Sequence, residues 1–164
     1  MNNLQKKNLF ILIVVATLAT LPWLGFSDFN TKGEPREAIV SLTMLQQDNW
    51  ILPHNNGGEM AYKPPFFHWC IAATATVLGG MSEWAARFPS ALACILMLAW
   101  MYVYYTKRRD AGTALTASLI CLGCFEIFRA AHACRVDMVL TFCIVGAIYA
   151  FARWTEHERC RPVP

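Results

Sequence analysis

Charged residues are scarce in this chain. Only 15% of its 164 residues are Asp, Glu, Lys or Arg, whereas 56% are hydrophobic. An ordinary soluble domain carries about 25% charged residues. The composition therefore excludes a typical soluble domain and indicates a protein that resides in a lipid bilayer.

Several other signatures are also missing. The sequence has no glycine-rich phosphate loop, no nucleotide-binding pattern and no basic stripe suited to nucleic acid, so we expect no nucleic-acid partner. The seven cysteines do not form a disulfide framework, because none lies between Asp28 and Lys63 and most fall within apolar stretches. Cys121 and Cys124 have a metal-motif spacing but are interpreted as small core residues of a hydrophobic helix.

Long uncharged stretches define the fold class. Residues 8–27 and 88–106 contain no charge, and each approaches the roughly 20 residues that cross a bilayer. Residues 111–128 and 138–153 are shorter between charges, but the arginines at their ends can extend to the interface. We therefore predict an all-α integral membrane protein with about four transmembrane helices and a long outer loop over residues 28–87.

The uncharged stretch 64–82 decides the topology. If it crossed the membrane, nine Lys and Arg residues would lie outside and five inside, which inverts the positive-inside rule. If it lies on the outer surface as an amphipathic helix, eight lie inside and six outside. The second arrangement is favoured, and it places both termini in the cytoplasm.

Two short helices are expected in the outer loop. Pro35 suits a first helical turn, and Ile39, Leu42 and Leu45 follow at a spacing of three, so an amphipathic helix is predicted to begin near Glu34. After an extended stretch and a turn at residues 55–58, the chain returns Lys63 toward the membrane. Pro65 then begins the surface helix, which carries Phe66, Phe67 and Trp69 at the interface.

The charges of this loop suggest a site for phosphate chemistry. Arg36 and Lys63 near a helix N-terminus can bind a phosphate, since arginine offers a fork and lysine a point charge. Glu34 can take a proton from an acceptor hydroxyl. On spacing alone, a solvated and salt-bridged loop is the commoner fate of such charges.

Four blocks of the sequence carry a family resemblance, which covers most of the chain. In order and spacing they resemble the first outer loop of GT-C membrane glycosyltransferases, the group of protein O-mannosyltransferases and lipid A aminoarabinose transferases. The blocks are Gly33-Glu34-Pro35-Arg36, Asp48-Asn49-Trp50-Ile51-Leu52-Pro53, Tyr62-Lys63-Pro64-Pro65 and Ala86-Arg87-Phe88-Pro89-Ser90-Ala91. A further resemblance is Asp137, which opens the fourth span as an aspartate does in that family.

The resemblance implies an activity and a set of site residues. It implies transfer of a sugar from a polyprenyl-phosphate donor to a lipid, glycan or protein acceptor at the outer face of the bacterial inner membrane. Glu34 and Asp137 would be catalytic, and the donor phosphate would bind a basic set: Arg36, Lys63, His132 and Arg135. Asp137 has a second interpretation as a helix N-cap, with Arg135 or Arg129 as its ion-pair partner. Glu126 and Arg129 are expected to pair with each other.

Two departures from the family pattern keep an alternative open. Gly33 stands where the family usually has its first acidic residue, and Tyr62 stands where a glutamate that can contact a metal precedes the lysine. A divalent metal is the cofactor that the resemblance would allow, but its site is not carried over. His54 and His68 are more often packing residues than ligands. The alternative is a non-catalytic membrane subunit that binds an anionic lipid or a partner protein.

Length sets a further expectation. Enzymes of this kind have many more spans and usually a soluble C-terminal domain. We therefore expect residues 1–164 to correspond to the N-terminal part of such an enzyme.

Overall fold

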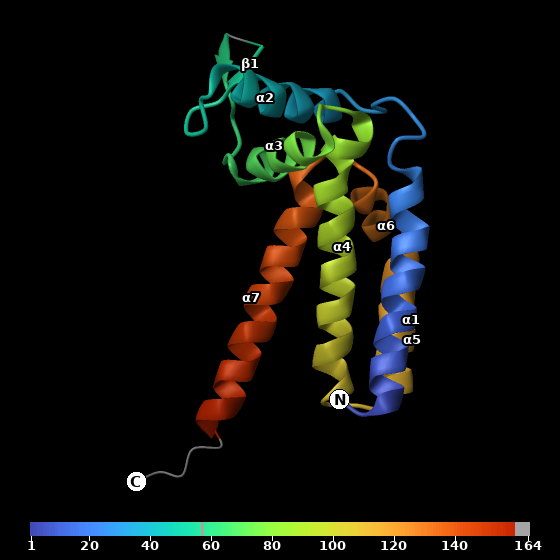
Figure 1. The fold of residues 1–164 in the computed structure, drawn as a ribbon. Coiled ribbons are helices and arrows are strands. Elements are labelled where there is room, and N and C mark those ends of the chain that lie inside the picture. Colours follow the sequence, from blue (N-terminus) through green and yellow to red (C-terminus); the bar gives the residue numbers. More distant parts are fainter. Residues whose placement is uncertain (57, 160–164) are drawn as a thin grey trace.

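The protein is an all-helical membrane protein in which long helices run side by side beneath a layer of two shorter ones (Figure 1). The computed structural model describes residues 1–56 and 58–159. The helices are α1 (Asn3–Thr20), α2 (Gly33–Gln47), α3 (Phe66–Leu78), α4 (Glu83–Thr106), α5 (Ala111–Gly123), α6 (Phe125–Ala131) and α7 (Val136–Arg159). A 3₁₀ turn, η1 (Leu21–Trp23), follows α1, and a two-stranded hairpin joins β1 (His54–Asn55) to β2 (Glu59–Met60).

Three of these helices are long and apolar enough to cross a membrane, which confirms the predicted class. They are α1 with η1, α4 and α7, and α5 with α6 makes a fourth candidate if the pair counts as one span. The sequence predicted one helix over residues 111–128, but α5 and α6 are bent by 70°. The break lies at Cys124, whose backbone leaves the helical region at φ −66° and ψ 124°.

The charged turns gather at the end of the bundle opposite α2 and α3. The Tyr102 hydroxyl donates to the Gln5 carbonyl at 3.0 Å, and the Asn8 amide donates to the Ala111 carbonyl at 3.4 Å. These bonds bring the start of α1 beside the α4–α5 turn (Figure 1). The lysines of residues 6–7 and the basic residues 107–109 therefore share one end, as the predicted topology requires.

Helices α4 and α7 pack through aromatic rings. The Trp100 ring lies against Gly146, where an added Cβ would come within 2.6 Å of its Cζ3 atom. Farther along, the rings of Tyr104 and Tyr149 stack with their centroids 4.2 Å apart. Small residues allow close approach of membrane helices in this way.

The outer layer consists of α2 and α3, which lie across the ends of the long helices (Figure 1). With 13 residues, α3 spans only about 20 Å at 1.5 Å per residue, too short to cross a bilayer. It buries Phe67 and Ile71 and leaves Phe66, Trp69 and Val77 exposed.

The predicted apolar face of α2 is wrong, although the helix lies where it was expected. Ile39 is exposed, and the buried positions of α2 are Glu34, Glu37, Ala38, Val40, Ser41, Thr43 and Met44. Two glutamates can face inward because basic partners elsewhere in the chain neutralise them.

Candidate functional site

A polar pocket lies between α2, the hairpin and the start of α3. Its charged lining consists of Arg36, Glu37 and Lys63, with His68 beside them. The Glu37 carboxylate accepts hydrogen bonds from the Lys63 ammonium and the His68 Nε2 atom, each at 2.8 Å, and the Arg36 guanidinium lies 3.4 Å away. One carboxylate thus contacts Arg36 and Lys63, two of the four basic side chains that were predicted to bind phosphate.

Local structure explains how these side chains meet. Arg36 and Glu37 are adjacent in the first turns of α2, so both reach the same pocket. The hairpin returns the chain, and the Ala61 amide donates to the Pro53 carbonyl at 3.0 Å. Pro65 then caps α3, which places Lys63 just before the helix and His68 in its first turn.

The electrostatics keep Glu37 ionised. Burial alone would raise the pKa of its carboxyl, but the hydrogen bonds from His68 and Lys63 and the Lys63 charge outweigh that effect. They lower this pKa from 4.5 to about 2. Arg36 and Lys63 have exposed side-chain fractions of 46% and 28%, so their cationic groups remain accessible from the pocket.

His68 is buried behind the pocket. Its Nδ1 atom has no hydrogen-bond partner among the described residues, while Nε2 is bonded to Glu37. The prediction that His68 is a packing residue fits its 1% exposure. It nevertheless contacts the charged lining directly.

A second cluster centres on Glu34 and Arg87, both of which are buried. The Arg87 Nε donates to one Glu34 oxygen at 3.0 Å, the Cys134 amide donates to the same oxygen at 3.0 Å, and the Asn30 amide donates to the other at 2.9 Å. Burial raises the pKa of Glu34, but these bonds and the Arg87 charge lower it on balance.

Arg87 extends this cluster into the loop after η1. Its terminal nitrogens donate to the carbonyls of Leu24, Ser27 and Asp28 at 2.7 to 2.9 Å. Glu34, which was predicted to be a catalytic base, thus has both oxygens bonded within the protein. This geometry fits a residue that holds α2, α4 and the start of α7 together, and its catalytic role stays a prediction.

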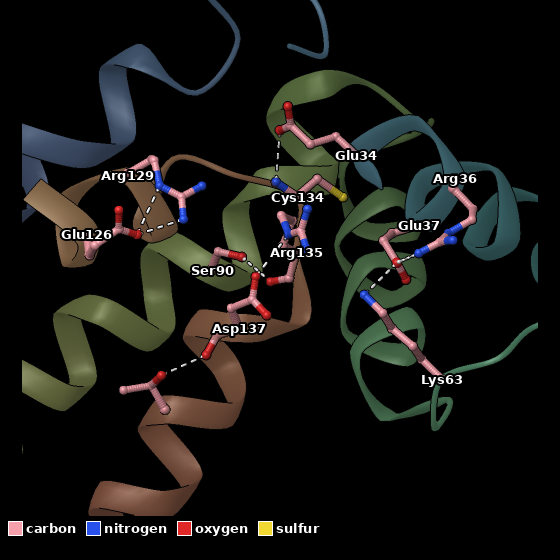
Figure 2. Close-up of polar contacts among 11 residues, drawn as sticks. Glu34, Arg36, Glu37, Lys63, Ser90, Glu126, Arg129, Cys134, Arg135 and Asp137 are labelled. Atoms are coloured by element: carbon pink, nitrogen blue, oxygen red, sulfur yellow. Dashed lines mark hydrogen bonds and ion pairs between the residues drawn. The ribbon is translucent and has the colours of Figure 1, made fainter. Parts of the chain in front are cut away.

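The remaining predicted site residues do not line the Lys63 pocket. Arg135 and Asp137 lie at the start of α7 (Figure 2), and His132 is the C-cap of α6. Arg135 and Asp137 pair at 2.9 Å, as one of the two expected pairings, and both are substantially exposed. A Cβ added at Gly33 would lie 3.1 Å from an Arg135 nitrogen, so Arg135 reaches the beginning of α2. Asp137 falls in the first turn of α7 rather than at its N-cap.

Helix α6 holds its own polar groups. Arg129 and Glu126 pair at 2.7 Å, as predicted. His132 makes a 2.8 Å bond between its Nδ1 atom and the Phe128 carbonyl, and it does not line the Lys63 pocket. Its predicted contact with the donor phosphate remains a prediction.

A separate apolar groove also involves α3. Its volume is about 220 Å³, and α3, α4 and α7 supply its walls. The lining residues are Phe66, Cys70, Thr74, Phe88, Pro89, Leu92, Ala93, Leu96, Val139, Phe142 and Cys143. Since His68 faces the pocket while Phe66 and Cys70 face the groove, the first turns of α3 contribute to both.

The side chains of the polar pocket do not form a metal-binding site. Within the described ranges, no group of three or more His, Cys, Asp or Glu side chains is placed to hold an ion. Tyr62 is 83% exposed and brings no carboxylate to the pocket. Glu37 is engaged by Lys63 and His68.

The sequence did not predict two features of the site: the contacts of Glu37 and the structural role of Arg87. Glu37 belongs to a charged run in the sequence. Its partners Lys63 and His68 lie 26 and 31 positions farther along the chain, so the sequence did not indicate these contacts. Arg87 carried a detectable signal, because an arginine beside the apolar run 88–106 needs a buried carboxylate or carbonyl partner.

The described residues form a polytopic helical membrane protein. Comparison defines the family: residues 62–162 match the model described as dolichyl-phosphate-mannose-protein mannosyltransferase, and the chain belongs to this family.

Curated relatives carry a related name. An undecaprenyl phosphate-alpha-4-amino-4-deoxy-L-arabinose arabinosyl transferase from Pectobacterium carotovorum is 28% identical over 154 residues, covering 90% of this chain and 26% of the relative. A protein of the same name from Pseudomonas savastanoi is 34% identical over 110 residues, covering 64% of this chain and 20% of the relative.

The fold also matches a solved structure. ArnT from Cupriavidus metallidurans, bound to undecaprenyl phosphate, superposes with a TM-score of 0.78 at 24% identity, covering 85% of this chain and 26% of that one. This likeness shows the all-helical membrane fold. The chain spans about a quarter of the length of the curated relatives that it matches.

Proposed function

We propose that this chain forms the donor-binding outer part of a glycosyltransferase that moves a sugar from a polyprenyl-phosphate donor to an acceptor at the outer face of the bacterial inner membrane. One observation carries the proposal: the polar pocket of Arg36 and Lys63 and the apolar groove share the first turns of α3. A phosphate linked to a long hydrocarbon needs one polar and one apolar environment. The names of the relatives support this substrate class.

The reaction follows from the chemistry of such a donor. An acceptor oxygen attacks the anomeric carbon, the bond from that carbon to the phosphate oxygen breaks, and the electron pair remains on the polyprenyl phosphate. Lys63 and Arg36 would stabilise this leaving group. The acceptor proton would pass to a carboxylate. Asp137, whose side chain is 53% exposed, is the accessible candidate, and this role requires the donor sugar to extend from the Lys63 pocket to the start of α7.

Donor binding can be tested by photocrosslinking. Undecaprenyl phosphate with a diazirine in its chain should crosslink to peptides of α3, α4 and α7 that line the groove. Lys63→Ala should reduce crosslinking about tenfold or more, because a charged contact to phosphate is lost. Lys107→Ala, at the opposite end of the bundle, is the matched control and should leave it unchanged. Equal crosslinking in both variants would contradict the phosphate role of Lys63.

Chemistry is tested separately by transfer of radiolabelled sugar in membranes that contain the chain. Asp137→Asn should abolish transfer and retain crosslinking, and Glu34→Gln tests the predicted base in the same assay. Crosslinking without any transfer in the unchanged chain would favour the alternative, a lipid-binding subunit without chemistry. Absence of crosslinking would contradict both functions.

A further inference from the structure

We propose that Glu37 lowers the net positive charge of the Lys63 pocket and so limits its preference for the doubly charged phosphomonoester product over the singly charged phosphodiester donor. This inference rests on the proposed function and adds a specificity-determining residue to it. Without Glu37, the pocket would favour the leaving polyprenyl phosphate over the incoming donor more strongly.

The charges on the pocket wall support this assignment. Its charged side chains are Arg36, Lys63 and Glu37, which sum to +1 when the His68 imidazole is neutral. Glu37 lies within 3.4 Å of both cationic groups, and its side chain is only 3% exposed. It is therefore a fixed internal counter-ion that solvent does not replace.

Lys63 still has capacity for a ligand. An ammonium group has three N–H donors, and one of them is directed to Glu37. The Lys63 side chain is 28% exposed, so the other two can reach a phosphate oxygen. Glu37 thus limits the positive charge of the pocket without closing it.

The transfer reaction changes the charge of the bound phosphate. A sugar phosphodiester carries one negative charge, whereas the released monoester carries about −1.5 to −2 near neutral pH. At a separation of roughly 6 Å and an effective dielectric constant of about 40, one unit of charge changes affinity about tenfold. Raising the pocket charge from +1 to +2 would therefore increase its preference for the product over the donor about tenfold.

The test compares two lipids that differ only in charge. Undecaprenyl phosphate and its methyl phosphodiester are titrated at pH 8 against the chain in nanodiscs, and the preference for the monoester is the ratio of the two affinities. Glu37→Gln makes the pocket +2 and should raise this preference about tenfold. Arg36→Gln makes it neutral and should lower the preference about tenfold. The double variant restores +1 and should return the preference to within about threefold of the unchanged chain.

The ratio of the two affinities isolates the charge effect, because a change in the position of Lys63 would weaken the binding of both lipids to the same extent. If Glu37→Gln fails to fold, Arg36→Gln and Arg36→Glu still provide a charge series, because Arg36 is half exposed. The inference is overturned if the preference for the monoester stays the same across the series or falls as the pocket becomes more positive. Either result leaves donor binding itself intact. If the unchanged chain binds neither lipid, the proposed function itself fails.

Discussion

Glu34 and Glu37 lie three residues apart on α2, yet each is bonded to a different part of the chain. Glu34 contacts Arg87 and the Cys134 amide, whereas Glu37 contacts Lys63 and His68. Both carboxylates are buried, and each is neutralised by residues that are distant in sequence. The structural role of each glutamate in α2 therefore depends on its ion-pair partners and not on its position in the helix.

Breaking the buried Glu34–Arg87 pair should be strongly destabilising. Arg87→Gln leaves a buried carboxylate uncompensated and removes donors from three loop carbonyls, so the free energy of unfolding should fall by about 3–5 kcal/mol. Thermal unfolding in detergent measures this loss. Arg129→Gln, which removes an exposed pair with Glu126, is the control and should cost far less. Equal losses would contradict the assigned burial.

Glu37 should make the fold sensitive to acid. Its pKa is lowered from 4.5 to about 2 in the folded state, so the stabilisation is fully present above pH 4.5 and is lost as the pH falls toward 2. The loss should reach roughly 3 kcal/mol. Unfolding midpoints from pH 6 to pH 2 should fall more steeply for the unchanged chain than for Glu37→Gln. Parallel curves would show that this carboxyl is not the titrating group.

Part of the site was predictable at this scale. Arg36 and Lys63 were predicted from the charge pattern and the resemblance, and the structure brings them to one pocket. The carboxylate between them was not predicted, because the helical face of α2 was assigned from Ile39, Leu42 and Leu45. Hydrophobic spacing cannot show that a buried stripe will contain glutamates when their partners lie on other elements.

At the scale of elements, the contact between α4 and α7 depends on Gly146. An Ala side chain there would meet the Trp100 ring at 2.6 Å, so Gly146→Ala should overpack the helix pair and cost about 1–3 kcal/mol. Gly123→Ala is the matched control, since no atom lies within 4 Å of its added Cβ. Thermal unfolding of both variants in the same detergent gives the difference. A Gly146→Ala variant as stable as Gly123→Ala would contradict this packing.

The long helices were easier to predict than their interruptions. Uncharged runs located α1, α4 and α7, because the bilayer demands about 20 apolar residues. The 70° bend between α5 and α6 was missed, since neither a proline nor a charge marks Cys124. The predicted turn at residues 55–58 joins β1 and β2, with residue 57 outside the described ranges.

At the scale of the whole molecule, the distribution of basic residues predicts orientation. The start of α1 and the α4–α5 turn, which carry Lys6, Lys7 and residues 107–109, lie at one end of the bundle, and α2 and α3 lie at the other (Figure 1). The polar pocket is lined by α2 and the start of α3. Glu59→Cys should add a label from a membrane-impermeant maleimide in intact cells. Arg109→Cys should add one only after permeabilisation, with the unchanged chain as background. The reverse pattern would contradict the positive-inside assignment.

The Cys134–Glu34 hydrogen bond joins residues that are 100 positions apart and fastens α2 to the start of α7. Arg87 fastens α4 to the same point. Separating these elements would expose a charged pair, which opposes a hinge motion of α2. Under the proposed function, the donor lipid would therefore reach its groove between α3, α4 and α7 from the side, without movement of α2.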